Sequence, residues 1–317
     1  MAFTGGGGSA LVGCGGEGER AALPAPGPPL AAGEGRRLLA RHVPELRYEV
    51  GERSFATDVR ALATRAVLRD AEGRVVARAP SVDALAGGAV LDAPSSGLPE
   101  RGDVAYGHAV RDPAGRVWLQ YWLFSTDNLQ DRGIVRTGRH EGDWELVQVG
   151  LDPARRPATL TLAQHSGAEG CAWGRRSARP VIFVANGSHA SYATPAVHGR
   201  PWPDPDDEAR GDGRRAVPRV EPIGDREPGW VAWPGLWGGS KGAWWNPVEN
   251  SSPRGPAFQA AGQWRNPAGF HAGARACGAG APPRPAALTA AAVGLALAAL
   301  VLLVVRRRRR SPGMTTT

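Results

Sequence analysis

An uncharged run of 20 residues, 286–305, constrains what this chain can fold into more than any other feature of its sequence. An α-helix rises about 1.5 Å per residue, so such a run spans about 30 Å, the thickness of a bilayer's hydrocarbon core. The run contains no proline, and its one hydroxyl, Thr289, gives it no polar face of the kind that core helices show. We therefore predict one C-terminal transmembrane helix at residues 286–305.

The five arginines at 306–310 orient this predicted helix. Arginine in a short flanking segment is retained on the cytoplasmic side, so residues 306–317 form a cytoplasmic basic tail in this interpretation. The expected location is the cell membrane, in a single pass, with the main domain outside the cytoplasm. Residues 1–20 lack the basic and apolar regions of a secretory signal. Either the true start differs, or the C-terminal helix itself directs insertion.

The net charge of +8 does not indicate a nucleic-acid partner. Without the five consecutive arginines, 33 basic residues face 30 acidic ones, so nucleic-acid binding is not the default expectation. Residues 1–35 are rich in Gly, Pro and Ala and are predicted to be disordered. Residues 36–275 form one predicted domain, and 276–285 form a Gly/Pro-rich linker.

The predicted domain has the pattern of an all-β fold. Two strand-like runs, 104–111 and 116–124, flank a type I turn at 112–115 and predict a hairpin. Both faces of the second run are apolar, so it is expected to be a central strand that is covered on both sides. Short helical spacing occurs at 36–43 and 57–64, and further strands are predicted at 143–150, 158–165 and 180–185. Together these features predict an antiparallel β-sandwich with short helices.

The cysteines and histidines leave alternatives open. The chain has three cysteines and no Cys-x-x-Cys pair, so in an exported domain Cys171 and Cys277 either form a disulfide or remain free thiols. His165 and His189 each end a predicted strand, where loops at one end of a sandwich either bring them to a shared site or leave them structural. The tryptophans between 230 and 245 form either a binding surface or a packed loop.

Residues 140–145, with the sequence HEGDWE, carry the chemistry. Alternate side chains of a strand share a face, so Asp143 and Glu145 point the same way. His140 precedes the bend at Gly142 and is able to fold back toward the two carboxylates. One imidazole and two carboxylates suit one divalent cation, Mg²⁺, Ca²⁺ or Mn²⁺, with Zn²⁺ also possible. The alternative interpretation is a solvated acidic turn that begins a structural strand.

Several motifs resemble the vacuolar protein sorting-associated protein 62 family over residues 38–275. That resemblance implies a domain type and leaves the activity undefined. The motifs are HEGDWE at 140–145, QHSG at 164–167, GSHASY at 187–192, PELRY at 44–48, ERSF at 52–55 and SPRGP at 252–256.

A weaker likeness is to the necrosis-inducing proteins, which carry a His-x-x-Asp-x-Glu pattern on a β-sandwich. The likeness implies that His140, Asp143 and Glu145 hold a divalent cation that acts at a membrane sphingolipid surface. A further acidic ligand lies upstream in that family, and Asp131 and Asp127 are the candidates here. This chain departs from the pattern in having Glu141 and Gly142 between His and Asp, so toxicity is not carried over.

Three function classes follow from these observations. The favoured one is a membrane-anchored, cation-dependent binding module for a lipid headgroup or glycan. The second is a metal-dependent hydrolase in which His165 or His189 transfers protons. The third is a structural or trafficking protein with no small ligand.

Overall fold

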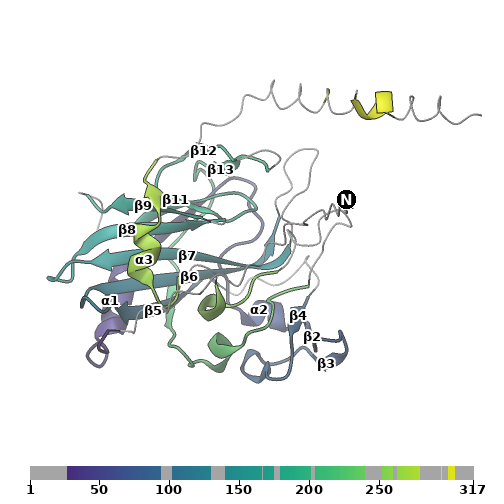
Figure 1. Cartoon of the computed structure of the whole chain (residues 1–317), viewed down its shortest axis with the longest axis horizontal. Helices are drawn as coiled ribbons and strands as arrows, with labels where there is room; N and C mark the ends of the chain where they lie inside the picture. Colours follow the sequence, from purple (N-terminus) through teal and green to yellow (C-terminus); the bar gives the residue numbers. More distant parts are fainter. Residues whose placement is uncertain are drawn as a thin grey trace, which may run out of the picture.

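The computed structural model describes residues 27–93, 102–129, 140–165, 167–174, 179–200, 204–239, 252–259, 263–278, 294 and 299–303. A seven-stranded sheet, with strand order β15-β5-β6-β7-β8-β9-β16, forms its centre (Figure 1). Its strands are β5 (Val104–Arg111), β6 (Val117–Asn128), β7 (His140–Leu151), β8 (Pro157–Gln164), β9 (Gly167–Ala172), β15 (Arg219–Pro222) and β16 (Arg275–Ala276).

Strands β5 and β6 form the predicted hairpin, and β6 is the predicted central strand. All 12 residues of β6 are buried, as expected from its two apolar faces. Its turn is closed by Asp112, whose carbonyl accepts from Gly115 N at 2.9 Å and whose Oδ1 accepts from Arg116 N at 2.9 Å. Gly115 has φ +84°, a conformation that glycine adopts without a steric cost.

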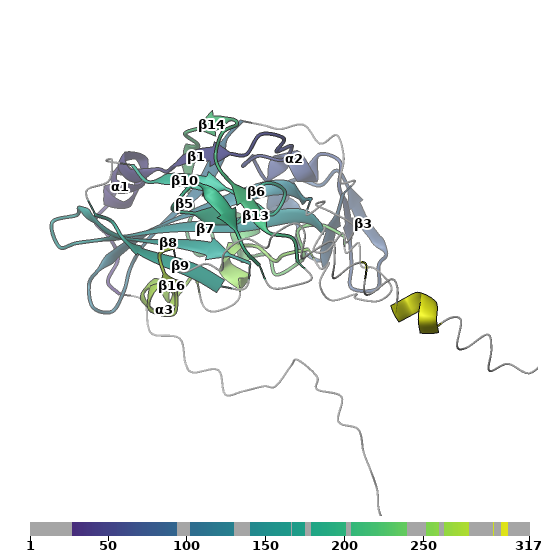
Figure 2. The ribbon, with the colours of Figure 1, turned by 90° about the horizontal axis from the view of Figure 1, so that it is seen from above.

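A four-stranded sheet, with order β11-β10-β1-β14, covers one face of the central sheet (Figure 2). Leu119 and Val147 of the central sheet belong to the same apolar cluster as Leu46 and Ile182 of the covering sheet. Helix α1 (Glu34–His42) also contacts β5 and β15. The covering strands are β1 (Glu45–Tyr48), β10 (Val181–Val184), β11 (Ser191–Tyr192) and β14 (Arg215–Ala216).

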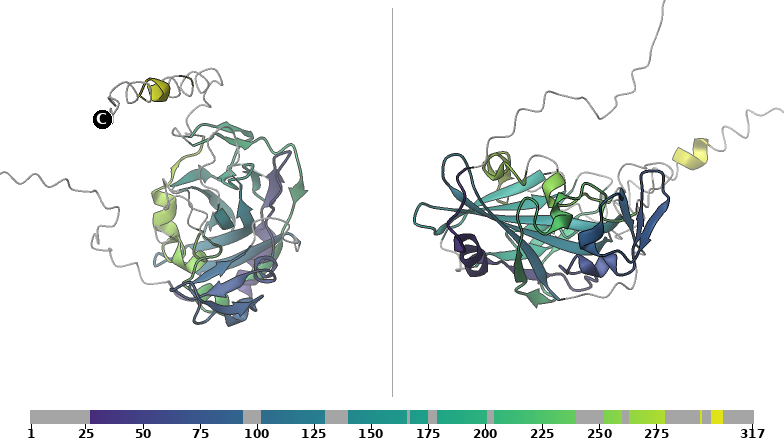
Figure 3. Two further views of the ribbon diagram at one scale, coloured as in Figure 1. Left: turned by 90° about the vertical axis from the view of Figure 1, so that its right-hand side faces the viewer. Right: turned by 90° about the horizontal axis from the view of Figure 1, so that it is seen from below.

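The other face carries a second core that is rich in tryptophan. Trp230, Trp233 and Trp237 are at most 5% exposed. Trp230 and Trp237 pack against Trp144, and Trp233 packs against Trp237, which supports the packed-loop interpretation for this part of the tryptophan segment. Figure 3 shows α2 with the three-stranded sheet β3-β2-β4 at one end of the central sheet. The elements outside the two large sheets are α2 (Arg60–Ala63), β2 (Val67–Arg69), β3 (Val75–Arg78), η1 (Val82–Ala84), β4 (Val90–Asp92), β12 (Ala196–His198), β13 (Asp207–Ala209), η2 (Gly229–Ala232), η3 (Pro256–Phe258) and α3 (Pro267–Ala272).

The predicted antiparallel sandwich is wrong in its strand directions and in its architecture. Both large sheets are mixed, because β1 pairs with β10, β15 with β5, and β16 with β9 in parallel. Each parallel partner is a short strand that returns from a distant part of the chain to an existing strand. The central sheet is covered by a sheet on one face and mainly by helices and loops on the other, which is not a clear sandwich.

The predicted transmembrane helix, and with it the location in the cell membrane, also requires correction. Within the described part of the chain, no helix has the length and apolar character needed to cross a membrane. Of the predicted span, only Gly294 and residues 299–303 are described. Most of the segment 1–35, most of the linker and all of the tail 306–317 also lie outside the described residues.

A disulfide joins Cys171 of β9 to Cys277, which directly follows β16. The bond ties the last described segment of the domain to the edge of the central sheet. Helix α3 packs there through Phe270, and Gln148 Nε2 donates to the carbonyl of Pro267 at 3.0 Å.

Candidate functional site

The candidate site lies where β6 ends and β7 begins. Ser125 lies opposite Asp143, and Asn128 lies opposite His140. The alternation of β7 places Asp143 and Glu145 on the face of Val147, toward the covering sheet. The predicted orientation of these two carboxylates therefore agrees with the register of the sheet.

Gly142 interrupts the alternation at the start of β7. Its φ is +58°, and a Cβ at this position would overlap the carbonyl oxygen of Trp237. On the opposite face, Oε2 of Glu141 accepts from Ala93 N at 2.9 Å and from Gly239 N at 2.8 Å. Glu141 therefore binds the backbone of two neighbouring segments, at Ala93 and Gly239, while the other acidic residues of HEGDWE face the candidate site.

Replacing Gly142 with alanine is expected to lower the free energy of unfolding by about 2 to 3 kcal/mol. The left-handed backbone costs a non-glycine residue about 1 to 2 kcal/mol, and the overlap with Trp237 adds to this cost. Gly115→Ala is the matched control, because Gly115 has a positive φ with open space around it. Urea unfolding of both variants is the measurement. Equal losses would contradict a specific role for the contact between Gly142 and Trp237.

His140 folds back toward Asp143 through its own backbone. Its Nδ1 donates to the carbonyl of Gly142 at 2.8 Å, so in the neutral ring the lone pair is on Nε2. That Nε2 faces Oδ1 of Asp143 at 4.0 Å, too long for a hydrogen bond. A ring nitrogen held by a backbone carbonyl while the other faces an acid is the arrangement of a metal-binding histidine.

The two oxygens of Asp143 have different surroundings. Oδ2 accepts from Asn128 Nδ2 at 3.0 Å and from His189 Nδ1 at 2.9 Å. Oδ1 is the oxygen that faces His140. The hydrogen bonds to Oδ2 therefore orient the carboxylate and direct Oδ1 toward Nε2 of His140.

His189 lies between two carboxylates. It is in the turn between β10 and β11, with φ +55°, and its side chain is 4% exposed. Its Nε2 lies 3.7 Å from Oε1 of Glu52. Burial lowers the pKa of His189, but the charge of Glu52 and the hydrogen bond to Asp143 raise it well above its ordinary value. The pKa of Glu52 falls to about 2, because the facing His189 and backbone donors outweigh its burial.

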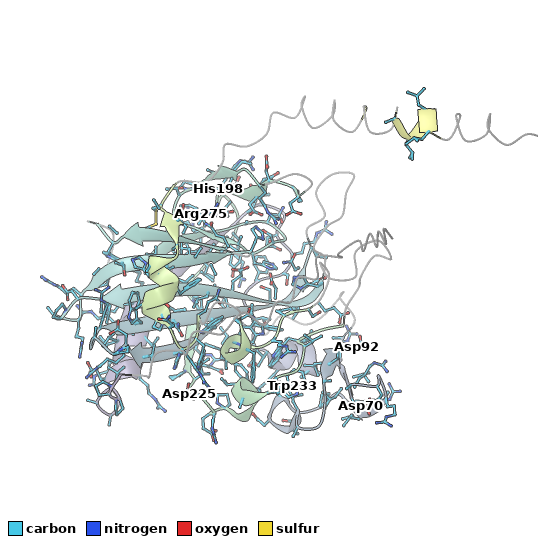
Figure 4. The ribbon with its side chains drawn as sticks, in the orientation of Figure 1. Asp70, Asp92, His198, Asp225, Trp233 and Arg275 are labelled. Atoms are coloured by element: carbon cyan, nitrogen blue, oxygen red, sulfur yellow. A yellow bond between two sulfur atoms is a disulfide. The ribbon has the colours of Figure 1, made fainter. Side chains whose placement is uncertain are left out.

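A second buried carboxylate, Asp207 of β13, collects three side-chain donors. His165 Nε2 lies 2.6 Å and Tyr192 Oη 2.7 Å from its Oδ2, and Ser188 Oγ lies 2.7 Å from its Oδ1. Burial raises the pKa of Asp207, but these hydrogen bonds and the charge of His165 lower it to about 2. Behind Tyr192 lies a polar cavity of about 20 Å³, which is also lined by His198 and Arg275 (Figure 4).

Glu145 lies in the negative field of both groups. Burial raises its pKa well above the ordinary value, and the charges of Asp143 and Asp207 raise it further, while His189 opposes them. A buried carboxyl group beside other acids is costly to ionise without a compensating positive charge. This donor set therefore fits a divalent cation, which would supply that charge.

The structure brings His140, Asp143 and His189 together, and it links His165 to the same region through Asp207. Asp131 lies outside the described residues. The one described set of three ligand atoms that all lie within 4.8 Å of one another is Glu169, Cys171 and Cys277. Its sulfurs form the disulfide, so they are not available as thiolate ligands. The three predicted ligands are more widely spaced and would have to move closer around a cation.

Sequence reasoning did not assign three residues of the site: Glu52, Asn128 and Asp207. Asn128 could be found by extending the β6–β7 register to the residue opposite His140. Glu52 begins the ERSF motif, but the motif itself indicates no partner. Asp207 lies in a run of acidic residues and prolines, where nothing distinguishes it from its neighbours.

No protein-family model matches this chain. The search of curated proteins also found no match. Among solved structures, NLPPya in complex with glucosamine matches at 17% identity and a TM-score of 0.34, over 63% of this chain and 79% of that chain. A non-toxic HaNLP3 protein matches at 16% identity and a TM-score of 0.33, over 64% and 80%. A structure described as a toxin fold as basis for microbial attack and plant defense matches at 18% identity and a TM-score of 0.32, over 63% of this chain and 80% of that chain.

These solved structures are necrosis- and ethylene-inducing-peptide-like proteins, the kind of protein named by the weaker sequence likeness. At these TM-scores and identities the match carries no argument about function. The resemblance to the vacuolar protein sorting-associated protein 62 family is not shown, because neither a family model nor a curated protein matches the chain.

Proposed function

We propose that the chain is a binding module in which His140, Asp143 and Glu145 hold one divalent cation, and that this cation binds a polar headgroup or a glycan. The observation that carries the proposal is the pair of ligand atoms, His140 Nε2 and Asp143 Oδ1, which face each other across 4.0 Å. Metal–ligand distances of about 2.0 to 2.6 Å allow one cation to bridge such a gap. Hydroxyl and phosphate oxygens of an outside ligand are suited to complete its coordination.

The burial of His189 counts against the form of the hydrolase alternative in which His189 transfers protons. The side chains of His140 and His165 are 14% and 24% exposed, and they form the accessible edge of a buried cluster. His189 is 4% exposed, and both its ring nitrogens face carboxylates. A histidine held in this way is poorly placed to exchange protons with solvent or substrate.

The test is thermal melting of the full chain in chelator and then with Mg²⁺, Ca²⁺ and Mn²⁺ in turn, with elemental analysis of the purified protein. A cation at 100 times its Kd stabilises the folded state by about 2.7 kcal/mol, a rise in Tm of roughly 5 to 10 °C. His140→Ala should lose this response. Asp83→Asn, in η1 and outside the cluster, should keep it. A wild-type protein with no bound metal and an unchanged Tm in every cation would contradict the proposal.

Glu145→Gln makes the test more specific, because the substitution keeps the shape and removes a buried acid. In chelator this variant should melt higher than the wild type, because folding no longer buries an acid whose pKa is raised by burial and by the charges of Asp143 and Asp207. With cation present it should gain little. If HEGDWE were only a structural turn, the order of the two Tm values would not change between chelator and cation.

A further inference from the structure

Glu52 is a buried acid that the proposed cation site does not use directly. It lies in the loop between β1 and α2, and its side chain is 2% exposed. Its Oε1 accepts from Arg53 N at 2.7 Å and from Ser54 N at 2.9 Å, and its Oε2 accepts from Gly187 N at 2.6 Å. These three backbone donors fix the carboxylate in place and attach it to the turn that carries His189.

His189 connects this fixed carboxylate to Asp143. One ring nitrogen lies 3.7 Å from Oε1 of Glu52, and the other lies 2.9 Å from Oδ2 of Asp143. At 3.7 Å Glu52 makes no hydrogen bond to Nε2, but its negative charge attracts that edge of the buried, planar ring. The attraction favours the ring orientation in which Nδ1 faces Asp143. His189 has a positive φ, which non-glycine residues adopt when the surrounding structure holds them there.

The orientation of Asp143 follows from this connection. With His189 and Asn128 both bound to Oδ2, Oδ1 is the oxygen presented to His140. Without Glu52, the ring would lose its partner on the Nε2 side and would be free to tilt. The carboxylate of Asp143 would then offer either oxygen to the cation, and the 4.0 Å approach of Oδ1 to His140 Nε2 would be lost.

We infer that Glu52 is a positioning residue of the cation site, which acts through His189 to direct Oδ1 of Asp143 toward the cation. The inference rests on the proposed function, because it assigns a role in binding that cation. Partners that orient a metal ligand typically contribute 10- to 100-fold to metal affinity. Glu52 is therefore expected to contribute to affinity from outside the coordination sphere.

Glu49 offers a matched control in the same loop. It is also a buried acid, at 5% exposure, and it accepts from a backbone nitrogen, that of Arg210, at 2.6 Å. Its other oxygen pairs with Arg210 Nη1 at 2.7 Å, away from His189. Substitution of either Glu49 or Glu52 therefore removes a buried carboxylate from this loop. Only substitution of Glu52 also removes a contact with His189.

The experiment is calorimetric titration of Mn²⁺ into the full chain, in the wild type, Glu52→Gln and Glu49→Gln. Glu52→Gln should weaken Mn²⁺ affinity by about 10- to 100-fold, while Glu49→Gln keeps wild-type affinity. Both variants should melt lower in chelator, so melting alone does not separate them. Wild-type affinity in Glu52→Gln would overturn the inference and leave the proposed cation site standing.

A second variant covers the case in which Glu52→Gln does not fold. His189→Gln keeps an amide donor for Asp143 but has no imidazole ring to interact with the carboxylate of Glu52. It should therefore weaken Mn²⁺ affinity by a similar factor. Wild-type affinity in this variant would also overturn the inference. A wild-type protein that binds no Mn²⁺ would overturn the proposed function and, with it, the role of Glu52.

Discussion

Breaking the disulfide between Cys171 and Cys277 is expected to lower the free energy of unfolding by about 4 to 5 kcal/mol in the chain-entropy model. The reason is the length of the closed loop, since the two cysteines are 106 positions apart. Without the bond, the segment 263–278 is held by contacts such as Cys277 N to Gly170 O at 3.0 Å. Arg275 Nη2 also donates to Gln164 Oε1 at 3.1 Å. Such single hydrogen bonds each contribute about 1 kcal/mol.

The measurement is urea unfolding of the wild type and the Cys171→Ser/Cys277→Ser variant, with Tm recorded alongside. A loss of this size corresponds to a fall in Tm of roughly 10 °C or more. Cys14→Ser is the control, because Cys14 is not part of the bond. A double variant as stable as the wild type, with the wild-type disulfide verified by mass mapping, would contradict the prediction.

The sequence predicted the strands well because strand faces are a local property. The residues of β6 alternate between two apolar faces, and the structure covers both of them. The turn at Asp112 was recognised from residue types that favour a type I turn, and its hydrogen bonds are those expected. Strand faces and turns depend on neighbours in the chain, so a single sequence contains the necessary information.

Strand pairing was not predictable in the same way. A period of two shows which side chains share a face, but it indicates neither the partner nor its direction. Strands β10 and β15 are four residues each, and they pair in parallel with strands that lie more than 100 positions earlier. Residues 286–305 show a related limit, since composition predicted a transmembrane helix and no described helix qualifies as one.

The residues of the candidate site also divide into those that local sequence predicts and those that depend on tertiary packing. His140, Asp143 and Glu145 were predictable, because they lie within six positions and their faces follow from the strand and its glycine. Glu52 and Asp207 reach the site from other parts of the fold, so their roles depend on tertiary packing. His189 was a candidate only by its place after a strand, and its two acidic partners became evident from the structure.

Replacing Asp207 with alanine is expected to lower the free energy of unfolding at neutral pH by about 3 to 5 kcal/mol. Removal of one member of a buried charged network leaves the remaining groups without their partner, and changes of this kind cost about that much. Three side chains lose their acceptor in this case: His165, Ser188 and Tyr192. The carboxylate is 2% exposed, so solvent does not already share these three donors in the wild type.

The pH dependence separates the charge of Asp207 from its shape. Its pKa falls from 3.8 to about 2 on folding, so its ionised form stabilises the folded state by about 2 kcal/mol. A depressed carboxyl pKa stabilises fully above the unfolded value, and this contribution is lost as the pH falls through about 2. The stability gap between wild type and Asp207→Asn should therefore narrow between roughly pH 4 and pH 2.

Urea unfolding of both proteins across this pH range is the measurement, with Asp204→Asn as the control. Asp204 pairs with Arg200 at 2.8 Å but its side chain is 31% exposed, so its loss should cost less than about 1 kcal/mol. The difference in the free energy of unfolding between wild type and Asp207→Asn stays constant down to pH 2 only if the charge of Asp207 does not contribute to it. Such a result would mean that the hydrogen-bonding geometry of the side chain, and not its charge, holds the three donors. In that case Asp207 would still be the shared hydrogen-bond acceptor of these side chains, but its negative charge would not account for the stability of this part of the site.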